Sequence, residues 1–401
     1  MSIFRSTRLR KFLIVRFGLI MLLVPMAVLS GESQTQHTKP TASEPIPEPA
    51  IPAILAAFDR YEVVAMPEAH GMKDVDDFIL TLIRDPSFPG KVNDIEVECG
   101  NSLYQPVLDS YIAGMDVPFA EVRKVWRNTT QSMCGYSGFF EQFFPLVRAI
   151  NQKLPTTKRL RVLAGDPPID WEKVKTSEEA RKFLDRGTSI VSVMEKEVLS
   201  KHRKALMLFG TFHLMHGTDS DVSTYEKDYP HLTFVVSDLG TYDTNRRVGS
   251  ISPFALWPHP TLALTKGTWL GALSLSDISP PPFNIDVDSE TCKVQIAFPA
   301  EMQKPMETLV DAFLYLGPQA FRLSEPMPAD IALDADYMAE LQRREALIGL
   351  PPGESPKSQK EFSDEIVQEA QNPILEGAPK LPDAKAIEQE CLEDKKRGNP
   401  Q

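Results

Sequence analysis

Short apolar runs alternate with amphipathic segments along the middle of the chain. The apolar runs have the length and composition of buried strands, at residues 61–66, 91–98, 159–166, 204–210 and 232–238. The segments between them repeat their apolar residues with helical spacing, at 75–85, 103–114, 138–154 and 177–202. Strands separated by helices are typical of βαβ units, whose strands run parallel. The pattern therefore predicts an α/β fold with a mostly parallel central sheet and helices on both faces.

The pattern becomes irregular in the last third of the chain. Less regular strand-like stretches follow, at 261–267, 294–298 and 310–317. A helix is expected over 330–348, where it would close the fold. We therefore predict one folded domain over residues 53–350, with irregular later strands.

Both ends of the chain lack this alternation. Residues 1–30 carry five basic residues before an apolar run, which predicts a signal peptide cleaved near Ser30, or a membrane anchor if it is kept. The polar, Pro-rich residues 31–52 predict a linker, and residues 351–401 predict a disordered tail with a short helix near 385–396. The protein is then exported, either periplasmic or secreted. It would touch a membrane only through an uncleaved N-terminal segment.

Charge and cysteine content narrow the class of protein further. The formal net charge is −12, and basic residues cluster only at the N-terminus, so we expect no nucleic-acid partner. A small molecule or a peptide is the expected substrate. The cysteines are spaced unlike a zinc site, at Cys99, Cys134, Cys292 and Cys391. Export would permit disulfides, and four cysteines allow three full pairings. We nevertheless expect the cysteines to be unpaired, as small buried residues and one thiol in the tail.

Acidic and histidine residues gather where the predicted strands end. They are Glu68 and His70, Glu96 and Glu98, Asp166, His213 and His216, and Asp238, in strand order. The carboxyl ends of parallel strands share one edge of a sheet, and open α/β folds bind ligands there. Residues two apart on a strand point the same way, as Glu96 and Glu98 would. We therefore predict a functional site at this edge.

Two kinds of chemistry fit these side chains. A histidine held by a carboxylate can act as general base on a water molecule, as His70 beside Glu68 would. Alternatively, histidines and glutamates can bind a divalent metal that activates the water. The structural alternatives are helix capping by Glu98 and a turn at Asp166 before Pro167.

One arginine is a further candidate. Arg127 follows Trp126 in the segment VWRNTT and could clamp a carboxylate or steady an oxyanion. An ordinary surface arginine beside a packing tryptophan is the alternative.

The ordered motifs resemble a known family. AMPEAHGMKDVDDFILTLIRD, IEVECGNSLYQPVLDSYIAG, VWRNTT, RLRVLAGD and LMLFGTFHLMHG are similar to those of erythromycin-esterase-like proteins. These proteins share their architecture with the ChaN-type haem-uptake and Tiki-type protease groups. The resemblance covers roughly residues 60–320. The helical lid of macrolide esterases is missing or shortened over 238–310, so macrolide hydrolysis is not expected.

The resemblance implies roles for individual residues. His70 would be the general base and Glu68 its supporting carboxylate. Glu98 matches the acidic residue that ends the second strand, and His213 matches the histidine after the fourth. Pro67 stands where the family usually has glycine. The Tiki-type group implies metal-dependent peptide hydrolysis, and the ChaN-type group implies haem binding without catalysis.

Three functions follow, in order of preference. The first is an exported hydrolase with no cofactor, in which His70 activates water against an ester or amide and His213, with Arg127, stabilises the oxyanion. Asp166, Glu96 and His216 would support this site. The second is a hydrolase with a divalent metal on Glu68, His70, Glu98 and His213. The third is a non-enzymatic protein that binds haem or another ligand.

Overall fold

The computed structural model describes most of the chain from residue 42 onward. The described residues are 42–68, 70–238, 256–278, 284–287, 291–297, 300–318, 322–349, 371 and 384–397. The predicted signal peptide, the first half of the predicted linker and most of the predicted tail lie outside them. Within the described ranges, no helix has the length and apolar character needed to cross a membrane.

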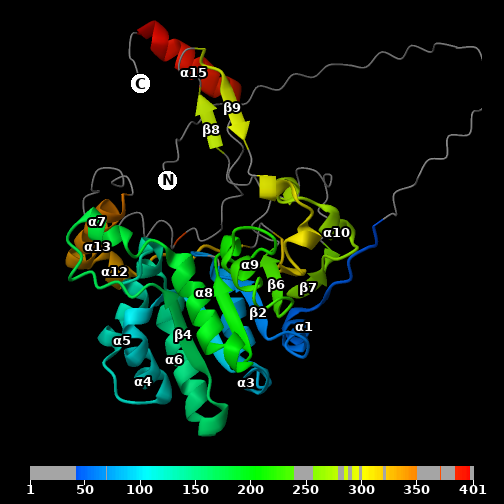
Figure 1. Ribbon diagram of the computed structural model, residues 1–401, viewed down its shortest axis with the longest axis vertical. Helices are drawn as coiled ribbons and strands as arrows, with labels where there is room; N and C mark the ends of the chain where they lie inside the picture. The colour runs from blue at the N-terminus through cyan, green and yellow to red at the C-terminus, as the bar shows by residue number, and fades with distance from the viewer. Residues whose placement is uncertain are drawn as a thin grey trace, which may run out of the picture. The chain divides into compact units, whose positions relative to one another are not determined.

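An eight-stranded sheet forms the centre of the fold (Figure 1). Its strands lie in the order β1-β7-β10-β6-β2-β5-β3-β4. Their bounds are β1 Glu48–Pro49, β2 Val63–Pro67, β3 Asp94–Asn101, β4 Arg161–Asp166, β5 Ala205–Phe209, β6 Thr233–Asp238, β7 Thr261–Leu264 and β10 Ala312–Tyr315. Neighbours from β10 to β4 are parallel, whereas β7 is antiparallel to β10 and β1. The predicted α/β class with a mostly parallel sheet is confirmed.

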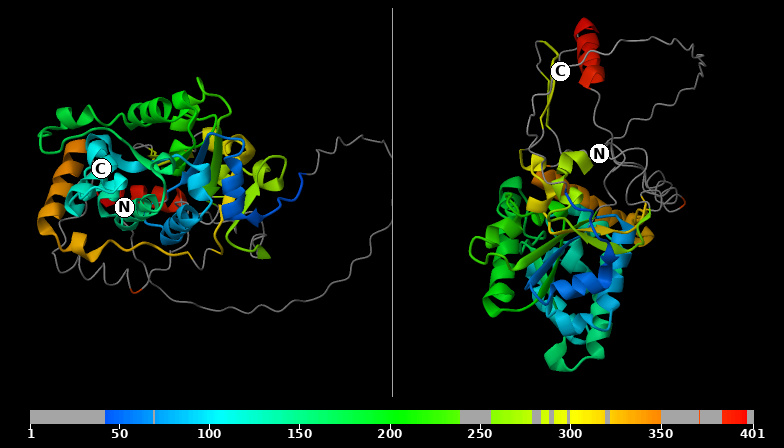
Figure 2. Two further views of the ribbon diagram at one scale, coloured as in Figure 1. Left: turned by 90° about the horizontal axis from the view of Figure 1, so that it is seen from below. Right: turned by 90° about the vertical axis from the view of Figure 1, so that its right-hand side faces the viewer.

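Helices cover both faces of this sheet, as predicted (Figure 2). One face packs against α1 Ala50–Ala57, α2 Lys73–Arg84, α4 Gln105–Ala113, α5 Phe119–Arg127 and α6 Phe139–Gln152. The other face packs against α8 Arg186–Glu197, α9 Asp221–Tyr225 and α10 Trp269–Ala272. The strands are buried on both sides for this reason, and their sequences are continuous apolar runs.

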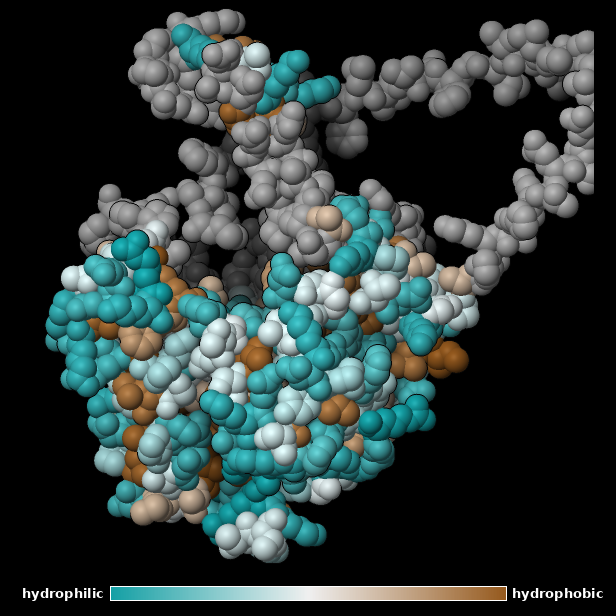
Figure 3. Space-filling view, viewed as in Figure 1, coloured by the Kyte–Doolittle hydropathy of each residue, from teal (hydrophilic) through white to brown (hydrophobic). Residues whose placement is uncertain are grey.

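The remaining elements are shorter or lie late in the chain. They are α3 Phe88–Lys91, α7 Ser177–Arg181, α11 Leu275–Ile278, α12 Ala329–Ala332, α13 Ala335–Ile348, α15 Ala384–Arg397, and the hairpin of β8 Asn284–Val287 with β9 Val294–Ala297. Helix α13 matches the one predicted over 330–348, and α15 matches the short helix predicted in the tail. On the face seen in Figure 3, hydrophilic residues predominate over the folded body and hydrophobic residues are scattered.

Two predicted boundaries were wrong. The helix expected over 177–202 is divided into α7 and α8, because Asp185 caps a new helix by accepting a hydrogen bond from the Thr188 N–H, and Gly187 weakens a continuous one. The fold also begins before residue 53, since β1 pairs with β7 and α1 starts at Ala50. The last residues of the predicted linker therefore belong to the folded part.

The cysteine prediction was also wrong. Cys99 is bonded to Cys134, and Cys292 is bonded to Cys391. The first disulfide joins the end of β3 to the turn over Ser132–Tyr136. The second joins the segment just before β9 to α15. The paired cysteines are 35 and 99 residues apart in the sequence, so no local sequence pattern could predict either disulfide.

Candidate functional site

The candidate site lies at the carboxyl ends of three adjacent strands. β5 lies between β2 and β3, so the chain following β2 and β5 meets the end of β3. β2 ends at Pro67, whose ring removes one backbone donor. The strand tolerates it because pairing with β6 stops at Ala65, while Glu68 N–H still bonds to Phe209 on β5. Pro67 thus fits the end of β2 without loss of a sheet hydrogen bond.

Glu98 is the centre of the cluster. The Gly210 N–H donates to Glu98 Oε2 at 2.6 Å, and Arg186 Nη2 donates to Oε1 at 3.0 Å. Burial opposes the charge of Glu98, but hydrogen bonds from His213 and His70 and the charge of Arg186 outweigh it. They hold the pKa of Glu98 well below its usual value. Glu98 is therefore a buried carboxylate that stays ionised.

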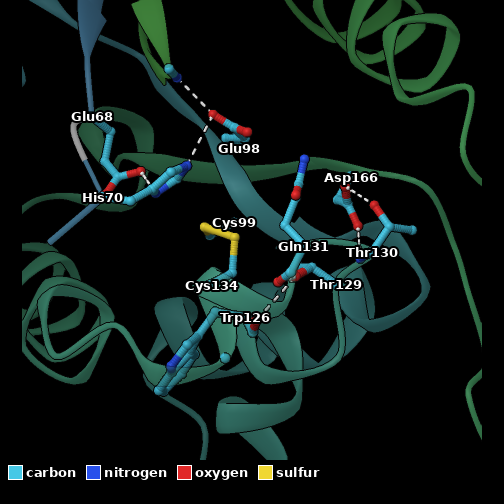
Figure 4. Close-up of a disulfide and its surroundings, with 12 residues drawn as sticks. Glu68, His70, Glu98, Cys99, Trp126, Thr129, Thr130, Gln131, Cys134 and Asp166 are labelled. Atoms are coloured by element: carbon cyan, nitrogen blue, oxygen red, sulfur yellow. Dashed lines mark hydrogen bonds and ion pairs between the residues drawn. A yellow bond between two sulfur atoms is a disulfide. The ribbon is translucent and has the colours of Figure 1, made fainter. Parts of the chain in front are cut away.

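His70 lies between two carboxylates (Figure 4). Its Nδ1 is 2.7 Å from Glu68 Oε2, and its Nε2 is 3.7 Å from Glu98 Oε2. Burial lowers the pKa of His70, but the charges of Glu68 and Glu98 dominate and raise it to about 11. His70 therefore keeps its proton at neutral pH when no other cation is present.

His213, like His70, lies between Glu98 and a second carboxylate. It ends the 3-10 turn Thr211–His213 that follows β5. Its Nδ1 lies 2.6 Å from Asp221 Oδ2, and its Nε2 lies 3.5 Å from Glu98 Oε1. Burial lowers the pKa of His213, and Asp221 and Glu98 together raise it to about 9. Each imidazole thus has one nitrogen beside its own carboxylate and the other facing Glu98.

A buried arginine completes the cluster. Arg186, at the start of α8, donates from Nε to Asp166 Oδ1 at 2.7 Å and from Nη2 to Glu98. Asp166 also accepts from the Thr130 N–H at 2.6 Å and from the Thr130 hydroxyl at 2.9 Å. Burial raises the pKa of Asp166, although Arg186 and Thr130 oppose the shift. Asp166 therefore orients Arg186 and lies at the sheet edge where it was predicted to support the site, so it does more than the turn residue of the alternative.

Sequence reasoning missed Arg186 and Asp221. Arg186 fell inside the predicted helix 177–202, and only the break before α8 places it at the sheet edge. The Asp185-Arg186-Gly187 order was a usable signal, because aspartate is a common N-cap and glycine disfavours a helix interior. Asp221 had no such signal, since only the fold brings α9 beside His213.

Two predicted residues, Glu96 and His216, do not join the cluster. Glu96 points to the same face of β3 as Glu98, as expected, but it lies deeper. Burial and the charge of Asp221 raise its pKa well above the usual value. His216 lies between Glu226, at 2.9 Å, and Asp311, at 3.0 Å. His216 therefore does not support the cluster, as had been expected.

Arg127 has a structural position, which corrects its proposed role. Its Nη2 donates to Glu141 at 2.9 Å, and its guanidinium lies over the Tyr337 ring. Trp126 is fully buried against Phe140 and Phe144 of α6. The packing alternative holds for Trp126, whereas Arg127 is only 14% exposed and is therefore not an ordinary surface arginine. Arg186, and not Arg127, lies beside Glu98.

The cluster contains polar atoms that suit a cation. Within the described residues, neither oxygen of Glu68 accepts an aligned hydrogen bond, and His70 Nδ1 makes none. Their 2.7 Å contact is close but poorly aligned. Buried polar atoms of this kind call for an unseen partner such as a water or an ion. Imidazole nitrogens and carboxylate oxygens are ligands that zinc and manganese accept. Among the described residues, the donors that all lie within 4.8 Å of one another belong to Glu68, His70 and Cys99, and this group does not include Glu98 or His213.

Comparisons with known proteins give two similar solved structures. No family model matches the chain, and no curated protein matches it. A structure of ChaN from Campylobacter jejuni, described as showing cofacial haem binding, is 12% identical. The match covers 47% of this chain and 84% of that one, with a TM-score of 0.28. A protein from Bacillus cereus is 10% identical over 69% of this chain and 95% of its own, with a TM-score of 0.39.

Proposed function

We propose that the protein is an exported, metal-dependent hydrolase that cleaves an ester or amide bond at the Glu98 cluster. The observation that carries the proposal is the arrangement of His70 and His213. Each imidazole is backed by a carboxylate at Nδ1 and turns Nε2 toward Glu98. Histidine ligands of metals commonly carry such a supporting carboxylate.

The charges around the imidazoles support a divalent cation. The carboxylates of Glu68, Glu98 and Asp221 favour positive charge beside the two imidazoles. In a metal-free protein, the protons bound to His70 and His213 supply that charge. A divalent cation brings the same two positive charges when it replaces those protons. Glu98, His70 and His213 would hold it, and Glu68 and Asp221 would orient the rings.

The raised pKa of His70 favours the second hypothesis over the first. A general base must lack its proton before the reaction begins. His70, with a pKa of about 11, carries that proton at neutral pH. The cofactor-free mechanism with His70 as base therefore loses support, and the metal-dependent alternative gains it. A bound divalent cation supplies Lewis-acid chemistry that polarises a carbonyl and makes a water more acidic.

Other residues of the cluster have roles in the same proposal. Arg186 carries a permanent positive charge beside Glu98 and is fixed by Asp166. A negative charge that develops on the substrate near Glu98 would be stabilised by this guanidinium. Asp166 acts by holding Arg186 in position. The substrate is a small molecule or a peptide, and the two disulfides support export.

Hydrolysis assays with and without metal test the proposal. Purified protein is screened against generic esters and peptides before chelation, after chelation, and after addition of Zn²⁺ or Mn²⁺. We expect chelation to abolish activity and metal to restore it. His70→Ala and His213→Ala should each lose at least about tenfold in activity or metal affinity. His202→Ala is the matched control, since that histidine is 82% exposed and pairs with Glu62 outside the cluster.

Different failures have different meanings. Hydrolysis that is unaffected by chelation would overturn the metal and keep the hydrolase. Wild-type protein with no hydrolysis under any condition, together with a Soret band on haem titration, would favour the ligand-binding alternative instead.

A further inference from the structure

The Cys99–Cys134 disulfide lies against the candidate site. Cys99 directly follows Glu98 on β3 and is fully buried. Its sulfur, one ring nitrogen of His70 and one oxygen of Glu68 all lie within 4.8 Å of one another. Figure 4 shows the disulfide beside His70 and Glu68. A nitrogen, an oxygen and a sulfur ligand thus already surround one point.

Glu68 supplies independent evidence that this point takes a ligand. Its side chain is 1% exposed, and within the described residues neither oxygen has an aligned hydrogen bond. Its Oε2 lies 2.7 Å from His70 Nδ1 without good alignment, and its Oε1 has no hydrogen-bond partner among the described residues, so a buried carboxylate with this poor pairing favours a cation or water beside it. The His70 Nδ1 beside it likewise makes no aligned hydrogen bond within the described residues.

Sulfur in a disulfide is a poor metal ligand, whereas a thiolate is a strong one. A dithiol reductant breaks the S–S bond by supplying two electrons and two protons, and the dithiol becomes its own disulfide. Cys99 and Cys134 are then thiols, and Cys99 loses its proton when it binds metal. Glutamate, histidine and thiolate together form a ligand set that zinc prefers.

We propose that reduction of the Cys99–Cys134 disulfide creates a second metal site, in which Cys99 joins Glu68 and His70 to bind a thiophilic divalent cation such as Zn²⁺. His70 belongs to both sites. A cation bound at Cys99 would therefore compete for His70 with any cation bound at Glu98 and His213, which couples the redox state to the site. The inference shares His70 with the proposed function, but it is read by metal binding and does not need hydrolysis.

Two serine variants test the proposal with matched stability. Cys134→Ser and Cys99→Ser both remove the same disulfide, but only Cys134→Ser leaves a thiol at residue 99. Each protein is titrated with Co²⁺, whose bond to a thiolate gives an intense near-ultraviolet band. We expect the band at one equivalent in Cys134→Ser and no such band in Cys99→Ser or in oxidised wild type. Adding His70→Ala to Cys134→Ser should weaken Co²⁺ binding at least about tenfold.

A band of equal strength in both serine variants, or in neither, would overturn the proposal. Unchanged Co²⁺ affinity in the Cys134→Ser protein that also carries His70→Ala would overturn it as well. These results are independent of the hydrolysis screen, so failure of one proposal leaves the other standing.

A second measurement covers the case in which the variants do not fold. Wild-type protein is reduced with a phosphine and alkylated with iodoacetamide, with and without Zn²⁺, and the modified peptides are identified by mass spectrometry. Zn²⁺ should protect Cys99 at least about tenfold more than Cys134. Equal protection of both cysteines, or none, would contradict the assignment.

Discussion

Single residues at the sheet edge have sharply different environments despite similar sequence context. Glu96 and Glu98 are two residues apart on one strand face, yet Glu98 meets Arg186 and the Gly210 N–H while Glu96 has no hydrogen-bond partner within the described residues. Burial therefore favours the neutral form of Glu96, whereas the ionised form of Glu98 is stabilised. Chemistry at this scale depends on neighbours that are distant in the sequence.

Asp221 offers the sharpest test at the residue scale. Asp221→Asn removes the carboxylate that faces His213 Nδ1 at 2.6 Å. If the proposed metal binds there, we expect its affinity to fall about 10- to 100-fold, the usual effect of removing a carboxylate that supports a histidine ligand. Competition with a chromogenic chelator measures this. Asp219→Asn, at an exposed position nearby, should leave the affinity unchanged.

A second residue-scale prediction concerns close packing at Gly100. A Cβ there would lie 2.8 Å from the Cα of Ala164 on the neighbouring strand β4. Gly100→Ala should therefore lower the free energy of unfolding by about 1–3 kcal/mol, because the backbone must shift. Urea denaturation measures the loss. Gly90→Ala, where a Cβ meets nothing within 4 Å, should change stability by less than about 0.5 kcal/mol.

At the scale of elements, side chains bond to the backbone groups of the edge strand that no neighbouring strand pairs with. β4 is the edge of the sheet, and Gln105 covers part of it. The Gln105 amide donates to the Val162 carbonyl and accepts from the Ala164 N–H, both at 2.8 Å. Asn151 makes the same pair of bonds with Leu160. These amides occupy edge groups that could otherwise pair with another chain.

Removal of one amide should expose this edge. Gln105→Ala is expected to lower the free energy of unfolding by about 1 kcal/mol and to increase aggregation on heating. Light scattering during a thermal ramp measures the second effect. Gln152→Ala, at an exposed residue at the end of α6, is the matched control. Equal scattering by the two variants would contradict a protective role for Gln105.

His216 makes a pH-dependent connection between elements. It joins the segment after β5 to Asp311 before β10 and to Glu226 after α9. Burial lowers its pKa, but Asp311 and Glu226 raise it to about 9. The stabilisation is fully present below the unfolded pKa of about 6.5 and is lost as pH rises through about 9. The gap in unfolding free energy between wild type and His216→Asn should shrink by up to about 3 kcal/mol over this window. A constant gap would exclude the linkage.

At the scale of the whole molecule, strand order concentrates the chemistry. The chain forms β2, then β3 and β4, and returns to insert β5 between β2 and β3. The carboxyl ends of three adjacent strands therefore meet at one edge, where Glu98 lies within β3, and Glu68, His70 and His213 follow β2 and β5. The two disulfides stabilise different parts, one beside this edge and one between α15 and the segment before β9.

The disulfides should therefore differ in their effect on stability. Cys134→Ser is expected to lower the unfolding free energy of the sheet by about 2–5 kcal/mol, as for other native disulfides. Cys391→Ser should leave the main thermal transition nearly unchanged and should accelerate proteolysis within α15. Differential scanning calorimetry and limited proteolysis measure the two effects. A similar fall in the main transition for both variants would contradict this separation.

The sequence by itself determined the fold class and the edge of the sheet at which the candidate site lies. Apolar strand runs and helical spacing are local patterns, and parallel strands bring their carboxyl ends together whatever lies between them. Glu68, His70, Glu98 and His213 could therefore be assigned to one site. Their grouping followed from topology alone.

Tertiary structure decided which residues act together and in what state. Arg186, and not the predicted Arg127, contacts Glu98. Asp221 contacts His213, and Cys99 is bonded to Cys134. The contacts of Arg186 and Cys99 join segments that are distant in the sequence. The pKa of His70 depends on burial and on two carboxylates, which no sequence window contains together. Electrostatic energies depend on distance and dielectric surroundings in space. The sequence could therefore place the site, but only the folded chain turned the interpretation from a general base toward a metal.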